Sequence, residues 1–369
     1  MNSYIRLKSV IAFTGGGTGG HIYPGLAVAA ALRDICGCDI VWLGSKNKID
    51  RSIVEAAGIK FEEISSGKLR RYFSLRNFTD IFRIIAGFFA SLLILKRRRP
   101  SLLFSKGGFV SVPPVVAAFM LRIPVYTHES DFSPGLATKI NAHLADKIFI
   151  AYKQTASYLS RKFLNKVIQS GNPVRPEFYA ANPEKGRSFL QIPPGEKILL
   201  VLGGSQGAAE INNLVENSLA GLTKNFFVVH QTGGGGELNT DKTIQPRYIR
   251  LSYIKDEMPD ILAAAALVLG RAGAGTVWEC AATGRPMVLV PLSGSATRGD
   301  QIENAKFFEE RGAARMLVRP DAAQLLETLN DLAGNEGQLT AMAAASAQIG
   351  TTRGAPVIAE HIVERILEK

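Results

Sequence analysis

Short apolar runs alternate with helix-length amphipathic segments along the whole chain. In the first half the runs are VIAF, DIVWLG, SLLFSK, PVYTHE and KIFIAY; after SGNPVRPEF the alternation restarts with KILLVLGG, FFVVHQTG, RYIRLSYI, ALVLGRAG and PMVLVPL. Apolar runs of this length, bounded by turn residues and separated by helical patterns, indicate the strands of a parallel sheet in βαβ units. The pattern therefore predicts an α/β protein with two similar halves.

The restart lies near Gly171–Pro176 and marks an expected domain boundary. A chain of 369 residues is also longer than the roughly 250–300 residues at which a single core stops growing. We predict two doubly wound Rossmann-like domains, residues 1–174 and 175–350, with a ligand cleft between them at the carboxyl ends of the strands. A C-terminal helix over about 351–369 is expected to pack back on the first domain.

The segment at 78–100, FTDIFRIIAGFFASLLILKRRRP, is apolar over an unusually wide face. Its longest uncharged run, Ile84–Leu95, has twelve residues, whereas a helix that spans a bilayer needs about 20. The polar positions before the basic end form a narrow stripe at helical spacing: Asp80, Arg83, Gly87 and Ser91. The remaining surface is predicted to contact lipid or a partner. A buried core helix with a solvated basic end is the alternative.

Charge is divided unevenly between the two halves. Residues 1–174 contain 24 Lys and Arg against 10 Asp and Glu, and the remainder contains 19 against 22. A basic half fits an anionic membrane surface, a nucleic acid or a phosphorylated substrate, and the alternative is a cationic face that only keeps the protein soluble. Because Lys96–Arg99 directly follow the apolar segment, we predict binding to the surface of an anionic membrane.

The three cysteines are expected to be reduced thiols of a cytosolic protein. Cys36 and Cys38 have C-x-C spacing, which is typical of neither a metal knuckle nor a disulfide framework, and Cys280 stands far away in the sequence. The opening stretch MNSYIRLKSVIAF has too short an apolar run for a signal peptide.

A glycine-rich stretch, GGGTGGH, connects the first predicted strand to the first predicted helix. From Gly15 it matches G-x-G-x-x-G, so a dinucleotide-dependent oxidoreductase has to be considered. However, Gly44 and Ser45 end the second predicted strand, where such an enzyme needs an acidic residue for the ribose. The stretch can instead bind a phosphate through backbone N–H groups and the helix N-terminus, with His21 as a group that titrates near neutral pH.

Two other glycine turns also follow predicted strands. SKGGFVSVPP begins at Ser105, and GGSQGA begins at Gly203 and includes the Ser205 hydroxyl. Each could be only a tight turn. One anion-binding turn in each domain favours a pair of substrates with separate phosphates.

The stretch GRAGAGTVWECAATGRPMVLVPL at 270–292 predicts a third glycine turn before a helix that begins near Thr276. Glu279 is expected in the first turn of that helix, where its carboxylate can accept the hydroxyls of a ribose; stabilisation of the helix dipole is the alternative. In GDQIENA, Asp300 and Gln301 are expected just before another helix, where they can bind sugar hydroxyls.

Five motifs, in this order over nearly the whole chain, resemble those of the MurG family: GGGTGGHIYPGLAVA, GNPVR, GGSQGA, GAGTVWECAATGRP and DQIENA. That family has the GT-B fold and makes lipid II of peptidoglycan from lipid I and UDP-GlcNAc. The resemblance implies an inverting transfer of GlcNAc to the MurNAc 4-hydroxyl of undecaprenyl-pyrophosphoryl-MurNAc-pentapeptide. It also implies a peripheral protein on the cytoplasmic face of the plasma membrane, no nucleic acid partner, and contacts with cell-wall synthesis and division proteins. Another GT-B glycolipid glycosyltransferase, a UDP-sugar epimerase and the oxidoreductase are the alternatives.

The resemblance assigns residues of this sequence to three sites. The UDP-GlcNAc site is implied at Thr18, Gly19, Gly20, Arg175, Ser205, Ile254, Gly275, Thr276, Glu279, Asp300 and Gln301. The acceptor pyrophosphate site is implied at Gly16, Gly17, Gly107 and Gly108. The membrane patch is implied at Phe78, Phe82, Ile85 and Phe88.

An inverting displacement needs a base for the acceptor hydroxyl and stabilisation of the departing UDP. We expect His21 to be the base, with Asp131 and Glu129 as rivals. Many family members read HEQN where this chain reads HESD, so Asp131 stands in place of an asparagine implied in acceptor contact. We found no D-x-D motif at a cleft position, so we expect neither a cofactor nor a dedicated metal site, and a divalent cation only as a stimulant.

Overall fold

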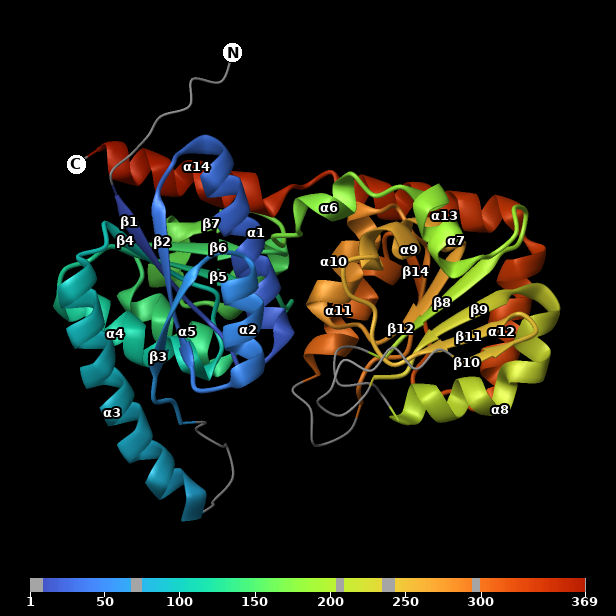
Figure 1. Cartoon of the computed structure of the whole chain (residues 1–369), viewed down its shortest axis with the longest axis horizontal. Coiled ribbons are helices and arrows are strands. Elements are labelled where there is room, and N and C mark those ends of the chain that lie inside the picture. The colour runs from blue at the N-terminus through green and yellow to red at the C-terminus, as the bar shows by residue number, and fades with distance from the viewer. Residues whose placement is uncertain (1–8, 68–74, 204–208, 234–242, 294–298, 369) are drawn as a thin grey trace. The chain divides into compact units, whose positions relative to one another are not determined.

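The computed structural model describes residues 9–67, 75–203, 209–233, 243–293 and 299–368, with the backbone alone for 75–79 and 243–245. It contains two compact units, Met1–Arg175 with Thr352–Lys369, and Pro176–Thr351 (Figure 1). Each unit is a sheet covered by helices on both faces. The prediction of two α/β domains with doubly wound parallel sheets is confirmed.

The first unit holds a seven-stranded sheet in the order β3-β2-β1-β4-β5-β6-β7, and each described pairing is parallel. The strands are β1 Val10–Thr14, β2 Asp39–Ser45, β3 Lys60–Ile64, β4 Leu102–Ser105, β5 Val125–Glu129, β6 Lys147–Ile150 and β7 Val167–Gln169. The helices are α1 Gly19–Ile35, α2 Lys48–Ala56, α3 Leu75–Arg98, α4 Val112–Met120, α5 Leu136–Leu144 and α14 Gly354–Leu367, and short 3₁₀ helices are η1 Phe109–Ser111, η2 Lys153–Tyr158 and η3 Arg161–Lys166.

Alternation along β1 divides the core of this unit between the two faces of the sheet. Ile11 and Phe13 belong to one buried cluster with residues of α1 and of the C-terminal helix α14. Ala12 belongs to the other cluster, with residues of α4. The strand order reverses between β1 and β4, and ligands of such sheets bind outside the carboxyl ends of the strands at this switch point.

The second unit holds a seven-stranded sheet in the order β10-β11-β9-β8-β12-β13-β14, antiparallel only between β10 and β11 among the described pairings. The strands are β8 Ile198–Leu202, β9 Phe227–Gln231, β10 Thr243–Gln245, β11 Tyr248–Leu251, β12 Leu267–Gly270, β13 Met287–Leu289 and β14 Ala314–Met316. The helices are α6 Pro176–Tyr179, α7 Pro183–Leu190, α8 Ala209–Asn225, α9 Met258–Ala264, α10 Ala274–Ala282, α11 Asp300–Glu309, α12 Ala322–Gly334 and α13 Glu336–Gly350. Here the switch point lies between β8 and β12.

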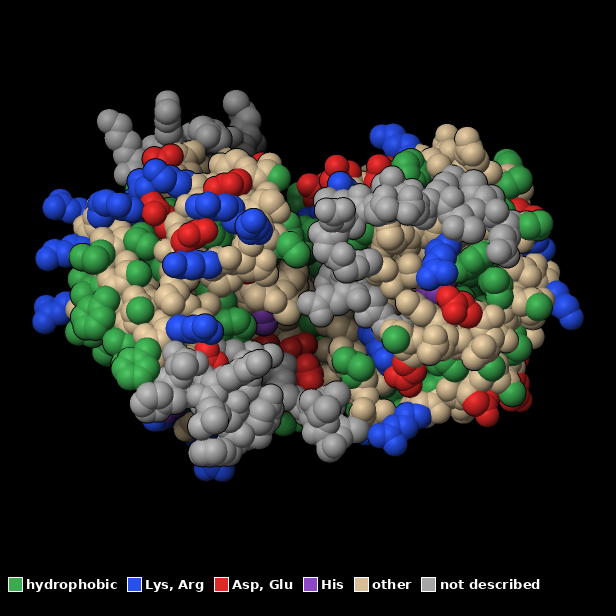
Figure 2. All heavy atoms as spheres, turned by 60° about the horizontal axis from the view of Figure 1, so that its bottom comes forward, with side chains coloured by type: hydrophobic (Ala, Val, Ile, Leu, Met, Phe, Trp, Pro, Cys, Tyr) green, Lys and Arg blue, Asp and Glu red, His purple; other side chains and the backbone are tan. Residues whose placement is uncertain are grey.

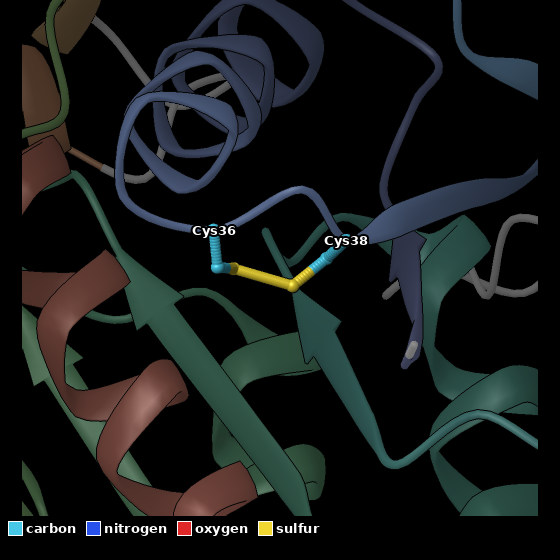
Figure 3. Close-up of a disulfide and its surroundings, with 2 residues drawn as sticks. All are labelled: Cys36 and Cys38. Carbon is cyan, nitrogen blue, oxygen red and sulfur yellow. A yellow bond between two sulfur atoms is a disulfide. The ribbon is translucent and has the colours of Figure 1, made fainter. Parts of the chain in front are cut away.

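Cys36 and Cys38 form a disulfide, which contradicts the expectation of reduced thiols (Figure 3). Cys36 is the residue after α1, and its extended backbone ends the helix before the chain enters β2. The Cα atoms of Cys36 and Cys38 are 5.5 Å apart, a separation usual for disulfides. Both side chains lie in the buried cluster beside α1. The remaining cysteine, Cys280, is a free thiol whose pKa is raised by burial.

Candidate functional site

The first glycine turn lies between β1 and α1, where hydrogen bonds from α2 and β2 fix its shape. Gly17 has a φ of +85°, which favours glycine. Its N–H donates to Asp50 Oδ2 at 2.7 Å, and the Gly15 carbonyl accepts from Trp42 Nε1 at 3.0 Å. The Gly17 N–H is therefore engaged in this structure, and a phosphate at this turn would have to use the neighbouring amides or displace Asp50.

Asp50 is a residue that sequence analysis missed. It is buried in the first turn of α2, and its carboxylate also accepts from Ser45 Oγ at 3.1 Å and Asn47 Nδ2 at 3.2 Å. The available signal was its place three residues after Asn47, which caps α2, because an acidic residue at that offset often completes a helix cap. Here the carboxylate reaches instead to the glycine turn.

The second glycine turn, Lys106–Gly108, lies beside the first because β4 neighbours β1 in the sheet. Gly107 and Gly108 both have positive φ, of 82° and 76°. A Cβ on Gly108 would lie 2.9 Å from His21 Cδ2 and 3.2 Å from the Gly16 carbonyl oxygen. The structure thus brings together both predicted acceptor turns and the predicted base, His21, at the switch point of the first sheet.

His21 stands in the first turn of α1, together with the predicted substrate residues Gly19 and Gly20. Its backbone N–H donates to the carbonyl of Thr18, the residue before α1, at 3.0 Å. The side chain is partly exposed. A titratable ring at a helix N-terminus, beside two glycine turns, is suited to proton transfer with a ligand.

The other two predicted bases differ in their contacts. Glu129 is buried, and its two carboxylate oxygens accept the backbone N–H groups of Asp131 and Gly135, each at 3.0 Å. Because both carboxylate oxygens are occupied by backbone N–H groups of the loop after β5, Glu129 is poorly placed to take a proton from a ligand. Asp131 is partly exposed, so its carboxylate is the accessible acid of the HESD motif.

His128 of the same motif has a structural role. It is the next-to-last residue of β5 and is buried, and its Nε2 lies 3.1 Å from the Gly171 carbonyl oxygen. Burial and the nearby charge of Lys106 hold its pKa well below the ordinary value, against the opposing effect of the Gly171 hydrogen bond. A neutral imidazole therefore ties β5 to the segment that ends the first unit.

The second unit presents the N-terminus of α10 at its own switch point. Gly273 is the residue before the helix, and Gly275 and Thr276 lie in its first turn, partly exposed. A Cβ on Gly275 would meet no described atom within 4 Å. Since the helix begins at Ala274, Glu279 lies in its second turn and not in the predicted first turn. The partly exposed Glu279 side chain stays a candidate for ribose binding.

Arg271 and Asn304 fix the loop that leads into α10. Arg271 is buried and donates to Glu210 Oε2 at 2.6 Å and to the Val290 carbonyl at 2.9 Å. Asn304, also buried, donates to the Ala272 carbonyl at 3.0 Å. Sequence analysis missed both residues, although Asn304 lies within the DQIENA motif. Their hydrogen bonds hold the backbone that positions Gly275 and Thr276.

Three other predicted donor residues have defined places in the second unit. Asp300 and Gln301 begin α11, so they lie within the helix and not before it as predicted. Gln301 Oε1 accepts the Leu292 N–H at 3.0 Å, which leaves its NH₂ group to donate to a ligand. The Ile254 N–H donates to Gln231 Oε1 at 2.9 Å, so this amide is engaged in the structure.

The remaining predicted donor residues lie elsewhere. Arg175 belongs to the first unit, and its guanidinium stands over the Tyr23 ring at 4.7 Å from the centroid. Ser205 lies outside the described residues.

The membrane patch predicted on α3 requires a correction. Phe82 and Ile85 are exposed, but Phe88 packs partly against the core and its neighbour Phe89 is the exposed ring. The side chain of Phe78 lies outside the described part of the chain. The large apolar residues that are exposed on the described part of this helix are Ile81, Phe82, Ile85, Phe89 and Leu93, here called the α3 patch.

The polar stripe of α3 mostly faces inward, which explains the exposed apolar face. Asp80 and Ser91 are buried, and a Cβ on Gly87 would lie 2.0 Å from the Ser65 carbonyl oxygen. Small and polar side chains therefore let the helix approach the chain that follows β3. Figure 2 shows hydrophobic side chains at the left edge of the molecule, next to several Lys and Arg side chains. No described helix is long and apolar enough to cross a membrane.

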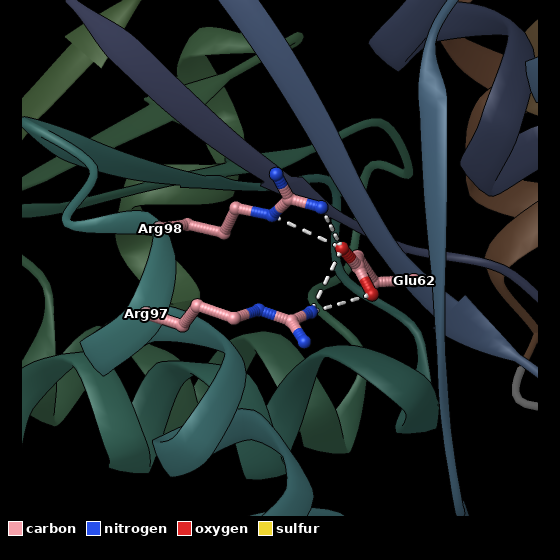
Figure 4. Close-up of polar contacts among 3 residues, drawn as sticks. All are labelled: Glu62, Arg97 and Arg98. Atoms are coloured by element: carbon pink, nitrogen blue, oxygen red, sulfur yellow. Dashed lines mark hydrogen bonds and ion pairs between the residues drawn. The ribbon is translucent and has the colours of Figure 1, made fainter.

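Two of the four basic residues after the α3 patch contact a carboxylate of β3. Arg97 Nη2 lies 3.1 Å from both Glu62 oxygens, and Arg98 donates to Oε1 from Nε at 3.0 Å and from Nη2 (Figure 4). Burial acts to raise the pKa of Glu62, but the Arg98 hydrogen bond and the charges of Arg98, Arg97 and Lys60 lower it overall. Lys96, Arg97 and Arg99 are exposed, and Glu62 offsets part of the positive charge of Arg97 and Arg98.

Comparisons with known proteins agree with this arrangement. The glycosyltransferase family 28 N-terminal domain matches residues 11–150, and the glycosyltransferase family 28 C-terminal domain matches residues 198–362. One relative is the UDP-N-acetylglucosamine--N-acetylmuramyl-(pentapeptide) pyrophosphoryl-undecaprenol N-acetylglucosamine transferase of Treponema denticola. It is 49% identical over an alignment of 378 residues, which covers 95% of this chain and 96% of the relative.

Two solved structures show the shared fold. The crystal structure of MurG from Acinetobacter baumannii has a TM-score of 0.69 at 23% identity and covers 98% of this chain and 100% of its own. The UDP-GlcNAc 2-epimerase of Neisseria meningitidis, bound to UDP-GlcNAc, has a TM-score of 0.65 at 15% identity and covers 98% of this chain and 100% of its own. Because a transferase and an epimerase share this fold, the fold alone does not choose between them.

Sequence identity to a curated transferase over most of the chain distinguishes the two enzyme classes. The Treponema denticola relative is 49% identical over 95% of this chain, a span that includes residues of both units. The family and the enzyme class predicted from the motifs are thereby confirmed: the chain belongs to the MurG family of N-acetylglucosaminyltransferases, within glycosyltransferase family 28.

Proposed function

We propose that this chain transfers GlcNAc from UDP-GlcNAc to the MurNAc 4-hydroxyl of undecaprenyl-pyrophosphoryl-MurNAc-pentapeptide, converting lipid I into lipid II. The observation that carries the proposal is the 49% identity, over 95% of the chain, to a relative named for these substrates. The first unit would bind the acceptor at the turns Gly15–His21 and Lys106–Gly108, and the second unit would bind the donor near the N-terminus of α10.

The reaction is a single displacement with inversion. The acceptor oxygen bonds to C1 of GlcNAc while the bond between C1 and the β-phosphate oxygen breaks, and its electron pair leaves with UDP. The hydroxyl proton passes to a base, for which we propose His21 because it is partly exposed beside both glycine turns. A base in this position contributes about 10²–10⁴-fold in rate. The helix N-terminus at Gly275 and Thr276 is suited to the negative charge that develops on UDP.

The α3 patch would bring the protein to its lipid substrate. Exposed Phe82 and Phe89 can enter the interface of a bilayer, while Lys96 and Arg99 meet anionic headgroups. With the family resemblance, this patch supports a peripheral enzyme on the cytoplasmic face of the plasma membrane as part of the proposal. Contacts with cell-wall synthesis and division proteins stay a prediction of the family resemblance.

The test is UDP release with a water-soluble short-chain analogue of lipid I. We expect release to require both UDP-GlcNAc and the analogue, and the product to carry a β-linked GlcNAc. Incubation of UDP-GlcNAc with the protein alone is the control, because an epimerase would convert the donor without any acceptor. Conversion without the acceptor, or equal release with an unrelated glycolipid, would contradict the proposal.

A further inference from the structure

Asn141 is a residue of α5 that is completely buried. Its neighbour Ala142 belongs to the apolar cluster on the same face of the sheet. An apolar side chain would be the ordinary choice at such a position, because a buried amide costs free energy unless hydrogen bonds compensate its burial. The hydrogen bonds of Asn141 therefore show what this amide contributes.

The amide of Asn141 joins two serines. Asn141 Nδ2 donates to Ser105 Oγ at 3.1 Å and to Ser111 Oγ at 2.9 Å, which uses both donors of the NH₂ group. Both serines are completely buried, like Asn141 itself. Asn141 Oδ1 has no hydrogen-bond partner among the described residues. Within this part of the chain, the side chain of Asn141 is therefore committed to the two serines.

The two serines stand on either side of the second glycine turn. Ser105 ends β4, before the turn, and its Oγ accepts the Gly107 N–H at 3.2 Å. Ser111 ends η1, after the turn, and it donates to the Gly108 carbonyl from its backbone N–H at 3.0 Å and from its Oγ at 2.8 Å. One amide thus connects the groups that hold both sides of the turn.

The conformation of this turn explains why it has to be held. Gly107 and Gly108 are consecutive glycines with φ of 82° and 76°, and glycine loses more conformational freedom on folding than any other residue. The imidazole of His21 lies against the same segment, since a Cβ on Gly108 would come within 2.9 Å of Cδ2. A shift of the turn would therefore change where the imidazole lies.

We propose that Asn141 is a positioning residue for the base: through the two serines it fixes the Gly107–Gly108 turn, and the turn fixes the imidazole of His21. This inference deepens the proposed function and rests on it, because His21 is the proposed base. Asn141 itself is too deeply buried to touch a ligand in this structure. Its effect is one of geometry, and a misplacement of about 1 Å can lower a rate about 10²-fold.

The experiment compares lipid-dependent UDP release by wild type and by Asn141→Leu, which introduces an apolar side chain with the same branching. We expect kcat/KM for the soluble lipid I analogue to fall by about 10- to 10²-fold. The KM for UDP-GlcNAc should stay near the wild-type value, because most of the proposed donor residues belong to the second unit. Unchanged kinetics in a folded Asn141→Leu would overturn the proposal.

Leu102→Val is the matched control. Leu102 is also completely buried, but it begins β4 and so lies at the opposite end of that strand from Ser105. The small cavity should lower the melting temperature without changing the kinetics for either substrate. A loss of acceptor kcat/KM in Leu102→Val as large as in Asn141→Leu would overturn the proposal, because general destabilisation would then explain both.

Asn141→Leu is also made in the His21→Ala background. If Asn141 acts through the imidazole, its replacement should change the residual turnover little in that background. A loss as large as the one measured in the presence of His21 would overturn the proposal, because Asn141 would then act without the imidazole.

The NMR signal of the His21 Cδ2 proton gives a measurement that does not depend on activity. The signal is identified by its absence in His21→Ala. We expect it to shift in Asn141→Leu and to stay in place in Leu102→Val, since Cδ2 lies against Gly108. An unshifted signal in Asn141→Leu would overturn the proposal. If wild type releases no UDP with the analogue, the proposed function fails, and the NMR comparison still decides whether Asn141 positions the imidazole.

Folding is checked by thermal melting, and Ser111→Ala is the second variant should Asn141→Leu fail to fold. It removes the hydroxyl bond to Gly108 but keeps the backbone bond, so the same changes are expected at smaller size, and their absence would overturn the proposal. If neither variant folds, hydrogen exchange of the Gly107 amide in wild type decides. Strong protection is expected for an N–H bonded to a buried hydroxyl. Exchange at the rate of an exposed loop would overturn the proposal.

Discussion

The imidazole of His21 lies against the backbone of Gly108, where a Cβ would come within 2.9 Å of Cδ2 and 3.2 Å of Cγ. Gly108 also has a φ of +76°, and its carbonyl oxygen accepts from Ser111 Oγ at 2.8 Å. Two turns that are far apart in sequence thus determine where a single side chain can lie.

Gly108→Ala should abolish most of the turnover because the new methyl group displaces the His21 ring. The positive φ alone would cost about 1 kcal/mol of stability. Gly195→Ala is the matched control: Gly195 has a φ of +86° and nothing described within 4 Å of its Cβ position. We expect a larger loss of melting temperature in Gly108→Ala, where the Cβ also meets His21 and the Gly16 carbonyl oxygen, and a loss of lipid-dependent UDP release only in that variant. Equal activity in the two would show that the position of His21 does not matter.

His21→Ala should reduce turnover by about 10²–10⁴-fold, the range for a general base. UDP affinity, measured by calorimetry, should stay near that of wild type because most of the predicted UDP-GlcNAc residues, Gly275, Thr276 and Glu279 among them, belong to the second unit. A variant that retains most of its turnover would remove His21 as the base.

Phe88 and Phe89 are neighbours with opposite surroundings, and they make a matched pair for the α3 patch. Phe89→Ser removes a ring that is 57% exposed, so vesicle binding should weaken while the melting temperature changes little. Phe88→Ser removes a ring that packs against the core and should lower the free energy of unfolding by about 2–4 kcal/mol. Sedimentation with anionic vesicles and thermal melting are the measurements. Unfolding of both variants to the same extent would contradict an exposed, lipid-binding face.

Glu62→Gln should destabilise the first unit at neutral pH. The pKa of Glu62 is lowered in the folded state, so its contribution is present above the pKa of the unfolded chain, about 4.3, and is lost as pH falls through the folded value. Because Arg97 is largely exposed, we expect a difference of only about 1 kcal/mol at pH 6. Urea unfolding of both proteins should converge near pH 3. Glu55→Gln, from the exposed pair with Arg51, is the control and should change stability less.

The sequence predicted the architecture because each element carries its own periodic signal. Buried strands such as Ile198–Leu202 are continuous apolar runs, and glycine turns follow them at the carboxyl edge of the sheet. These signals are local. Gly108 and Gly275 belong to different halves of the chain, but each follows a strand at the switch point of its own sheet.

What the sequence could not predict depends on contacts between distant residues. The narrow polar stripe of α3 reads as a solvent face, but Gly87 and Ser91 face inward because the chain near Ser65 approaches the helix closely. Lys106 in SKGG looks like an ordinary surface lysine, but it is buried, and its Nζ donates to Ser130 Oγ in the loop after β5. In both cases a residue type usual at the surface is buried by partners that no local pattern reveals.

The last prediction concerns the donor. Glu279 lies one turn further into α10 than predicted, but its side chain is partly exposed on the helix whose N-terminus is proposed to face UDP. A carboxylate that accepts two ribose hydroxyls contributes about 1.5–3 kcal/mol, so Glu279→Ala should raise the Michaelis constant for UDP-GlcNAc by more than tenfold. Turnover at saturating donor should change much less, because the ribose contact is the same in the ground state and the transition state.

Glu309→Ala is not a suitable control for this prediction, since Glu309 accepts the Met316 N–H. Glu327→Ala removes an exposed glutamate of α12 instead and should leave the donor kinetics unchanged. Donor kinetics that stay at the wild-type value in Glu279→Ala would exclude Glu279 from the ribose site.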